Sequence, residues 1–177
     1  MRRVCILGAS GSGKTTLASR LARRIRVEHV ELDALYHGPQ WKAPRPEDFR
    51  ARVEAIVMRD SWVIDGGYGG ALGDLVPRAA DTIVWLDLPL PVTLARLARR
   101  SLRRVVLRTE LWNGNRETLR GLFWGRDSLF PWTLKRHARF RRELPKRFLT
   151  EAYASKAIHR LRSQHQIDDF LGACRAA

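Results

Sequence analysis

The chain has 177 residues, of which 45% are hydrophobic, and a formal net charge of +15. This length suits one domain with a full hydrophobic core, so we expect a single domain over residues 1–177. No apolar run is long enough to span a membrane, and Cys5 and Cys174 lack the spacing of a metal site. We expect a reduced cytoplasmic protein, a monomer or a homodimer, with no membrane partner.

The positive charge is concentrated in one part of the chain. Between residues 96 and 147, sixteen Lys and Arg residues stand against four acidic residues, a local excess of +12. Such a basic field attracts phosphate-rich partners, either nucleotides or nucleic acid. Solvated helix faces account for part of the same charge.

The first motif joins a predicted strand at 3–8 to a predicted helix at 14–26. Residues 8–15 read Gly-Ala-Ser-Gly-Ser-Gly-Lys-Thr, which fits the phosphate-loop pattern G-x-x-x-x-G-K-[ST]. Backbone N–H groups of such a loop surround phosphate oxygens at the positive end of the helix, and the threonine hydroxyl binds Mg²⁺. We therefore expect ATP and Mg²⁺ as cofactors, with the nucleotide bound by Gly8, Ala9, Ser10, Gly11, Ser12, Gly13, Lys14, Thr15 and Thr16.

Further apolar runs alternate with helical patterns. Strands are predicted at 28–32, 61–65, 81–87 and 156–161, and helices at 46–60, 91–106 and 164–172. This alternation predicts an α/β fold with a five-stranded parallel sheet and helices on both faces, and ligands that bind beyond the carboxyl ends of the strands. We interpret two irregular intervals, 37–45 and 107–131, as parts of an acceptor-side segment (about 33–60) and a lid (about 101–135).

Three aspartates stand at the carboxyl ends of predicted strands. Asp65 precedes Gly66-Gly67 and is expected to assist Mg²⁺ binding, although an aspartate that starts a turn gives the same pattern. Asp33 is expected to orient an acceptor hydroxyl and take its proton. A role as N-cap of the residues that follow accounts for an aspartate at this position equally well. We interpret Asp87 as structural, as the cap of the turn between a strand and the following helix.

Arginines and aromatic residues supply the remaining candidate positions. Arg96 and Arg100 are four apart on one predicted helix, so they share a face. A second basic helix is predicted from about residue 132 to 142, where His137 is interpreted as a surface histidine. Arg100, Arg136 and Arg139 are expected to close on phosphate oxygens, with solvated surface charge as the alternative for each. The acceptor pocket is expected to contain Asp33, Trp41, Gly66, Gly67 and Tyr68.

The segments 8–15, 32–35, 62–68 and 80–87 together resemble the adenylate-kinase-like and shikimate-kinase-like P-loop kinases, in particular the bacterial DNA topology modulation (FlaR-related) proteins. The resemblance implies a nucleoside-monophosphate-kinase-like P-loop NTPase fold with an Arg-rich lid insertion. It also implies that Asp65 supports Mg²⁺, that Arg96 lies near the base and that Arg100 lies near the phosphates. Gly67-Tyr68-Gly69 departs from the F-P-R of adenylate kinases, which argues against a mononucleotide acceptor.

These features predict a Mg²⁺–ATP-dependent kinase for a small-molecule acceptor, with Lys14, Asp33 and Arg100 as catalytic residues. The alternative is an NTP-binding, nucleic-acid-associated regulator of the DNA topology modulation type. That alternative is supported by the basic interval, in which Trp112, Trp124 and Trp132 alternate with arginines. Aromatic side chains in a basic groove can stack on the bases of single strands. Lid arginines and core tryptophans explain the same residues, so nucleic acid is a possible but less favoured partner.

Overall fold

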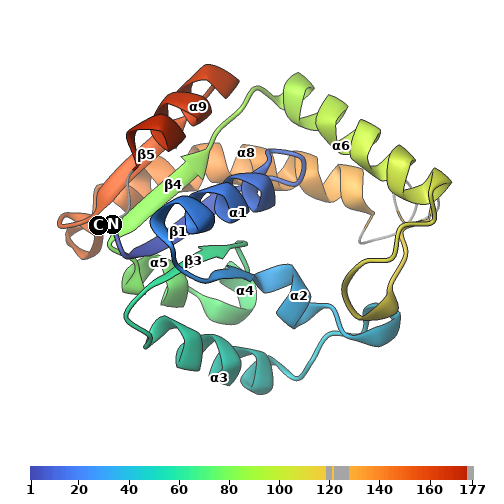
Figure 1. The fold of residues 1–177 in the computed structure, drawn as a ribbon, viewed down its shortest axis with the longest axis horizontal. Helices are drawn as coiled ribbons and strands as arrows, with labels where there is room; N and C mark the ends of the chain where they lie inside the picture. Colours follow the sequence, from blue (N-terminus) through green and yellow to red (C-terminus); the bar gives the residue numbers. More distant parts are fainter. Residues whose placement is uncertain (119–120, 122–127, 175–177) are drawn as a thin grey trace.

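A single parallel sheet organises the molecule in the computed structural model, which describes residues 1–118, 121 and 128–174 (Figure 1). Its five strands lie in the order β2-β3-β1-β4-β5. The central strand pairs with β3, where Cys5 is opposite Ile64, and with β4, where Cys5 is opposite Ile83. The predicted five-stranded parallel sheet is confirmed, with strands β1 (Arg3–Gly8), β2 (His29–Glu31), β3 (Trp62–Asp65), β4 (Thr82–Leu86) and β5 (Ala157–Leu161).

Helices cover both faces of the sheet, as predicted (Figure 1). The first and last helices, α1 and α9, pack on one face, while α3, α4, α5 and α8 pack on the other. The described helices and 3₁₀ turns are α1 (Lys14–Ile25), α2 (Leu32–Tyr36), η1 (Pro39–Trp41), α3 (Pro46–Val57), α4 (Gly69–Leu72), α5 (Leu75–Ala79), α6 (Leu90–Val106), η2 (Trp112–Gly114), α8 (Leu129–Phe148), η3 (Glu151–Tyr153) and α9 (Gln164–Ala173).

The alternation of side chains along β1 builds the two cores. Val4 and Ile6 pack with α1 and α9, whereas Cys5 and Leu7 join the core on the opposite face. Because helices cover both faces, the interior strands β1, β3 and β4 are buried and mostly apolar along almost their whole length rather than alternating. The interior strands are therefore held rigidly, and the loops at their carboxyl ends start from fixed positions.

Some parts of the structure differ from the sequence-based expectation. The basic helix α8 is longer than predicted, and the predicted lid interval 101–135 includes the end of α6 and the start of α8. His137 is not a surface residue: it is 9% exposed, and its Nε2 lies 3.0 Å from the Leu88 carbonyl oxygen, because α8 packs over the end of β4. Trp124 lies outside the described residues.

Cys5 and Cys174 are both buried free thiols. Over the described ranges, none of the helices combines the length and apolarity that crossing a bilayer requires.

Candidate functional site

The phosphate loop lies between β1 and α1, directly beneath α6. Gly11 has a φ of +83°, and a Cβ there would clash with the Thr93 carbonyl oxygen and lie 2.9 Å from Leu97 Cβ. Gly13, with a φ of +94°, also adopts the left-handed conformation immediately before α1. The loop glycines are therefore required both by backbone geometry and by the close approach of α6.

Lys14 begins α1 and is directed back over the loop. Its Nζ donates a hydrogen bond to the Ala9 carbonyl oxygen at 3.1 Å. Burial lowers the pKa of Lys14, and the nearby Asp33 and Asp65 carboxylates oppose that shift. The ammonium group therefore lies between the phosphate loop and two of the predicted acidic residues.

Thr15 brings two carboxylates together. Its Oγ1 lies 2.8 Å from Asp65 Oδ2 and 3.2 Å from Glu31 Oε1, but a hydroxyl has only one hydrogen to donate. Burial raises the pKa of Glu31, and the Asp65 and Asp33 carboxylates raise it further. Two carboxylates thus meet at one hydroxyl, and together these three side chains offer a set of oxygen atoms that a divalent cation can bind.

These residues fit Mg²⁺ rather than a metal held only by protein. Within the described ranges, no three His, Cys, Asp or Glu side chains form a ready-made metal cage. Mg²⁺ commonly keeps several waters and binds through one or two carboxylates together with substrate phosphates. Thr15, Asp65 and Glu31 at the phosphate loop match that pattern.

Glu31 is the functional candidate that the sequence analysis missed. It ends β2, and the sheet register pairs it with Asp65 on β3. An acidic residue that ends an apolar strand, two positions before Asp33, is a signal that could have indicated it. Asp65 itself is 2% exposed, and its Oδ1 lies 2.8 Å from His29 Nε2.

Asp33 faces the predicted acceptor side. It lies in the first turn of α2, whose N-cap is Glu31, so the N-cap interpretation of Asp33 is wrong. The Tyr68 hydroxyl donates to Asp33 Oδ1 at 2.5 Å and lies 3.4 Å from His37 Nε2. Burial strongly raises the pKa of Tyr68, so the phenol stays protonated as a donor.

Helix α6 presents two of the predicted arginines to the loop. Arg96 Nη2 donates to Gln164 Oε1 at 3.0 Å, and a Cβ at Gly13 would lie 3.8 Å from Arg96 Nη1. The Nε of Arg100 is buried and has no hydrogen-bond partner among the described residues. Burial lowers the pKa of Arg100, while Glu117, Asp33 and Glu31 favour its charged form. Arg100 is therefore a buried cation near the carboxylates of the site.

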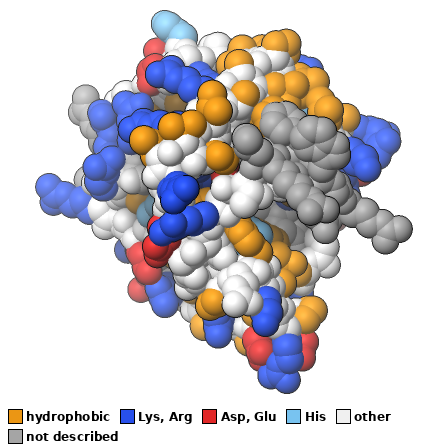
Figure 2. Space-filling view, turned by 90° about the vertical axis from the view of Figure 1, so that its right-hand side faces the viewer, with side chains coloured by type: hydrophobic (Ala, Val, Ile, Leu, Met, Phe, Trp, Pro, Cys, Tyr) orange, Lys and Arg blue, Asp and Glu red, His pale blue; other side chains and the backbone are white. Residues whose placement is uncertain are grey.

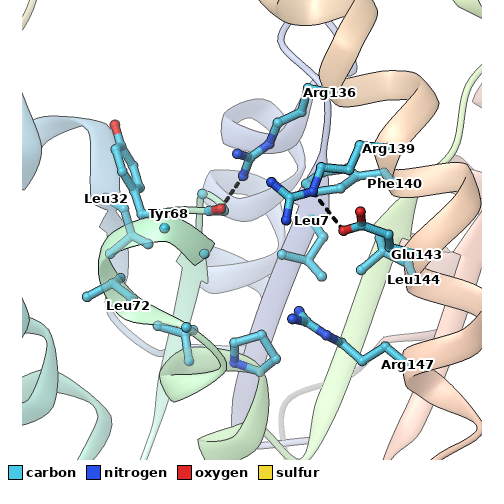
Figure 3. Close-up of a pocket in the computed structure, with 17 residues that line it drawn as sticks. Leu7, Leu32, Tyr68, Leu72, Arg136, Arg139, Phe140, Glu143, Leu144 and Arg147 are labelled. Atoms are coloured by element: carbon cyan, nitrogen blue, oxygen red, sulfur yellow. Dashed lines mark hydrogen bonds and ion pairs between the residues drawn. The ribbon is translucent and has the colours of Figure 1, made fainter.

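Arg136 and Arg139 lie on α8, opposite the glycine turn that follows β3 (Figure 3). Arg136 donates to the Gly67 carbonyl oxygen, and its guanidinium lies 4.7 Å from the centre of the Phe140 ring. Burial lowers its pKa, and Tyr68 and Asp33 partly oppose the shift. Arg139 instead pairs with Glu143 at 2.7 Å. Both arginines line a cavity of about 90 Å³.

The two glycines after β3 shape this region. Gly66 has a φ of +135°, and a Cβ there would lie 2.8 Å from Leu32 Cβ. A Cβ on Gly67 would collide with the Arg136 guanidinium. Figure 3 shows the hydroxyl of Tyr68 directed away from the arginines of α8. The Gly66-Gly67 turn thus brings Tyr68 to Asp33 and leaves room for Arg136.

Comparisons with known proteins agree with this architecture. No family model matches the chain. The chain is 30% identical over 105 residues to "Uncharacterized protein YqaC" of Bacillus subtilis, which covers 58% of each chain. It is 28% identical over 111 residues to a shikimate kinase of a Sulfurihydrogenibium species, which covers 55% of this chain and 67% of that protein.

A solved structure extends the likeness to almost the whole chain. The shikimate kinase of Bacteroides thetaiotaomicron aligns with a TM-score of 0.56 and 16% identity, covering 97% of this chain and 94% of that one. The chain has the fold of a shikimate-kinase-like P-loop kinase. The closer likeness to DNA topology modulation proteins stays a prediction.

Within this P-loop fold, Asp87 has a structural role, but it forms ion pairs and does not cap the turn before α6, whose N-cap is Pro89 and has no side-chain hydrogen bond. Asp87 is 2% exposed and binds Arg160 Nη2 at 2.6 Å and Arg141 Nε at 3.0 Å. These contacts attach β5 and α8 to the end of β4. Asp87 therefore holds the helix that carries Arg136 against the sheet.

Trp41 lies at the outer edge of the predicted acceptor pocket of this fold. It is 41% exposed, and its ring meets that of His37 edge to face with the centroids 5.2 Å apart. Its backbone N–H donates to Asn115 Oδ1 at 2.8 Å. The acceptor-side segment is thereby joined to residues of the predicted lid.

The basic charge is distributed unevenly on the face that contains the lid side of the P-loop fold. Figure 2 shows Lys and Arg side chains there in separate groups, divided by hydrophobic and other side chains. Residues outside the described ranges cover part of this view. The visible part does not form one continuous basic stripe.

Proposed function

We propose that the chain transfers the γ-phosphoryl group of Mg²⁺–ATP to a hydroxyl group of a small molecule that also carries an anionic group. The meeting of Thr15, Asp65 and Glu31 at the phosphate loop, with Asp33 close enough to Lys14 to affect its pKa, carries this proposal. The partial sequence similarity to shikimate kinases supports the same class of reaction.

On the nucleotide side, the loop N–H groups and Lys14 would bind the phosphates, while Arg100 would neutralise charge on the transferring group. Arg100 is suited to this role because its buried guanidinium has a nitrogen without a partner among the described residues. Mg²⁺, when bound, neutralises phosphate charge and aligns the phosphates. Thr15 would contact it, and Asp65 and Glu31 would hold it directly or through water.

On the acceptor side, Asp33 would accept the proton of the attacking hydroxyl. One of its oxygens already accepts the hydrogen bond from Tyr68, so the other is the one available to the acceptor. Arg136, which makes its hydrogen bond to a carbonyl rather than a carboxylate, would bind an anionic group of the acceptor. Trp41, Gly66 and Gly67 would complete the pocket.

The nucleic-acid-associated alternative rests on exposed aromatic and basic residues. Trp132 is 43% exposed, and the Arg136 guanidinium lies 5.1 Å from the centre of its ring. The separate basic groups in Figure 2 fit a groove for single strands poorly. We therefore place this alternative second.

The test is ATP consumption and product formation, measured by mass spectrometry against pooled hydroxylated carboxylates, sugars, sugar phosphates, nucleosides, nucleotides and aminoglycosides. We expect one pool to give a phosphorylated product. Lys14→Ala should reduce its formation at least about 100-fold, since it removes a preorganised charge at the transferring phosphate. Lys146→Ala makes the same change at an exposed lysine of α8 and should keep the parent activity.

Two outcomes would count against the kinase. Product formation that survives Lys14→Ala would mean that another site does the chemistry. ATP binding without product in any pool, together with binding to single-stranded DNA that is retained at 200 mM salt, would favour the regulator.

A further inference from the structure

A short hairpin from the predicted lid lies against the acceptor-side segment. Glu110 and Arg116 form an isolated antiparallel bridge that closes it, and we call residues 110–116 the docking hairpin. Asn115 is 3% exposed, donates to the Gly38 carbonyl oxygen at 2.9 Å and accepts from the Trp41 N–H at 2.8 Å. These hydrogen bonds of a buried side chain give the docking hairpin a defined position.

Trp112, in the docking hairpin, reaches the metal side of the site. Its indole N–H donates to Glu31 Oε2 at 2.9 Å. Its ring stacks on that of His37, with the centroids 5.6 Å apart and the planes at 24°. A single side chain therefore contacts both His37 of the acceptor-side segment and the Glu31 carboxylate beside the phosphate loop.

The two carboxylates next to Thr15 are held in the same way. Glu31 offers Oε1 to Thr15 and Oε2 to Trp112. Asp65 offers Oδ2 to Thr15 and Oδ1 to His29. In each case a nitrogen donor holds the oxygen that faces away from Thr15, which leaves the carboxylate little freedom to rotate.

We propose that Trp112 is a positioning residue that orients Glu31 for Mg²⁺ and thereby links the docking hairpin to metal-nucleotide binding. This inference rests on the proposed function of the same site. Mg²⁺ demands near-ideal octahedral geometry, so a carboxylate that must first be ordered binds it, or its waters, more weakly. Outer contacts that orient metal-binding groups typically account for 10- to 100-fold in metal affinity.

The experiment measures the binding of a non-hydrolysable ATP analogue by calorimetry, with and without Mg²⁺, so that no acceptor is needed. The readout is the factor by which Mg²⁺ tightens analogue binding. Trp112→Phe keeps a stacking ring but removes the indole N–H. We expect this factor to fall about tenfold, while the affinity measured without Mg²⁺ stays within twofold of the parent.

A double-mutant cycle tests whether Trp112 acts through Glu31. Glu31→Gln should reduce the Mg²⁺ factor by itself, and adding Trp112→Phe to it should have little further effect. Equal and independent losses in the two backgrounds would overturn the proposal. Trp112→Tyr, which also lacks an indole N–H, replaces Trp112→Phe if that variant fails to fold.

Asn113→Gly serves as the matched control in the docking hairpin. Asn113 has a φ of +57°, which glycine tolerates, and its side chain donates to the His37 carbonyl oxygen at 2.6 Å without touching Glu31. We expect the parent Mg²⁺ factor for this variant. If Asn113→Gly reproduces the loss, general undocking rather than the indole hydrogen bond is responsible, and the proposal fails.

The remaining outcomes separate this proposal from the proposed function. If Trp112→Phe weakens binding equally with and without Mg²⁺, or leaves both unchanged, Trp112 is not a positioning residue for the metal. If the parent chain binds no analogue under either condition, the proposed function itself fails, and Trp112 has no metal-nucleotide site to serve.

Discussion

The phosphate side and the acceptor side of the site are constructed differently. The phosphate side comes from one continuous loop, residues 8–15, and from the ends of the adjacent strands β2 and β3. The acceptor side is assembled from α2, η1, the docking hairpin and α8, which are far apart in the sequence. Backbone geometry defines the first side, whereas contacts between distant side chains define the second. We therefore expect changes on the phosphate side to affect chemistry. Changes on the acceptor side should affect order and specificity first, apart from Asp33, the proposed proton acceptor, and Trp112, which contacts Glu31.

Replacement of Arg100 should give the largest effect in this comparison. Arg100→Met keeps an aliphatic stem but removes the charged guanidinium, and we expect the rate of phosphoryl transfer to fall by about 10²–10³. Burial lowers the pKa of Arg100, which means that its charged form makes the folded chain less stable. The melting temperature of the variant should therefore equal or exceed that of the parent. Single-turnover kinetics on the acceptor identified by the product screen, together with calorimetry, would check both parts.

Arg103→Met is the control for this prediction, because it makes the same change at an exposed arginine one turn along α6. It should leave the rate near that of the parent. A lower melting temperature for Arg100→Met with an unchanged rate would instead assign Arg100 to the fold.

Replacement of Asn115 should loosen the acceptor side while leaving the phosphate side intact. Asn115→Ala removes the partners of the Gly38 carbonyl and the Trp41 N–H. A fully buried group without a partner costs about 1–3 kcal/mol, and these partly buried groups should cost less because water can reach them. We expect faster amide hydrogen exchange in residues 37–42 and 110–116, with residues 8–15 unchanged. Uniformly faster exchange over the whole chain would show that the two sides form one cooperative unit.

The same contrast explains how much could be predicted from the sequence. The phosphate loop and the five strands were predictable because a motif of eight residues and continuous apolar runs are local signals. Asp65 was found because it directly follows such a strand. The expected roles of Lys14, Asp33 and the arginines remain predictions until the variants above are measured.

The missed features all depend on contacts between distant residues. Glu31 reads as part of a strand, and only the register with β3 brings it to Asp65 and Thr15. In the sequence, only Asn113-Gly114 marks the docking hairpin as a turn. Its position depends on the hydrogen bonds from Asn115 to Gly38 and from Trp112 to Glu31, which no local pattern predicts. His137 reads as a surface histidine among basic residues, and the packing of α8 over β4 buries it.

Glu31 provides the smallest predicted effect, and it tests whether the phosphate side is built for a cation. Burial raises the pKa of Glu31 above its ordinary value of 4.5, so the folded chain holds this proton more tightly than the unfolded chain does. The stability that the protonated carboxyl contributes is therefore present at low pH and is lost as the pH rises from about 4.5 through the raised value. At neutral pH, Glu31→Gln should raise the melting temperature by about 1–3 °C.

The pH and ligand dependence of this difference distinguish its causes. The difference between Glu31→Gln and the parent should vanish below about pH 4, because the carboxyl is then protonated in both the folded and the unfolded chain. Adding Mg²⁺ with an ATP analogue at neutral pH should reverse the order, because bound ligand stabilises the parent more. If Glu31→Gln lowers the melting temperature at neutral pH without ligand, the ionised carboxylate already stabilises the fold through Thr15 and Trp112. The pair of carboxylates at Thr15 would then be stable without a metal.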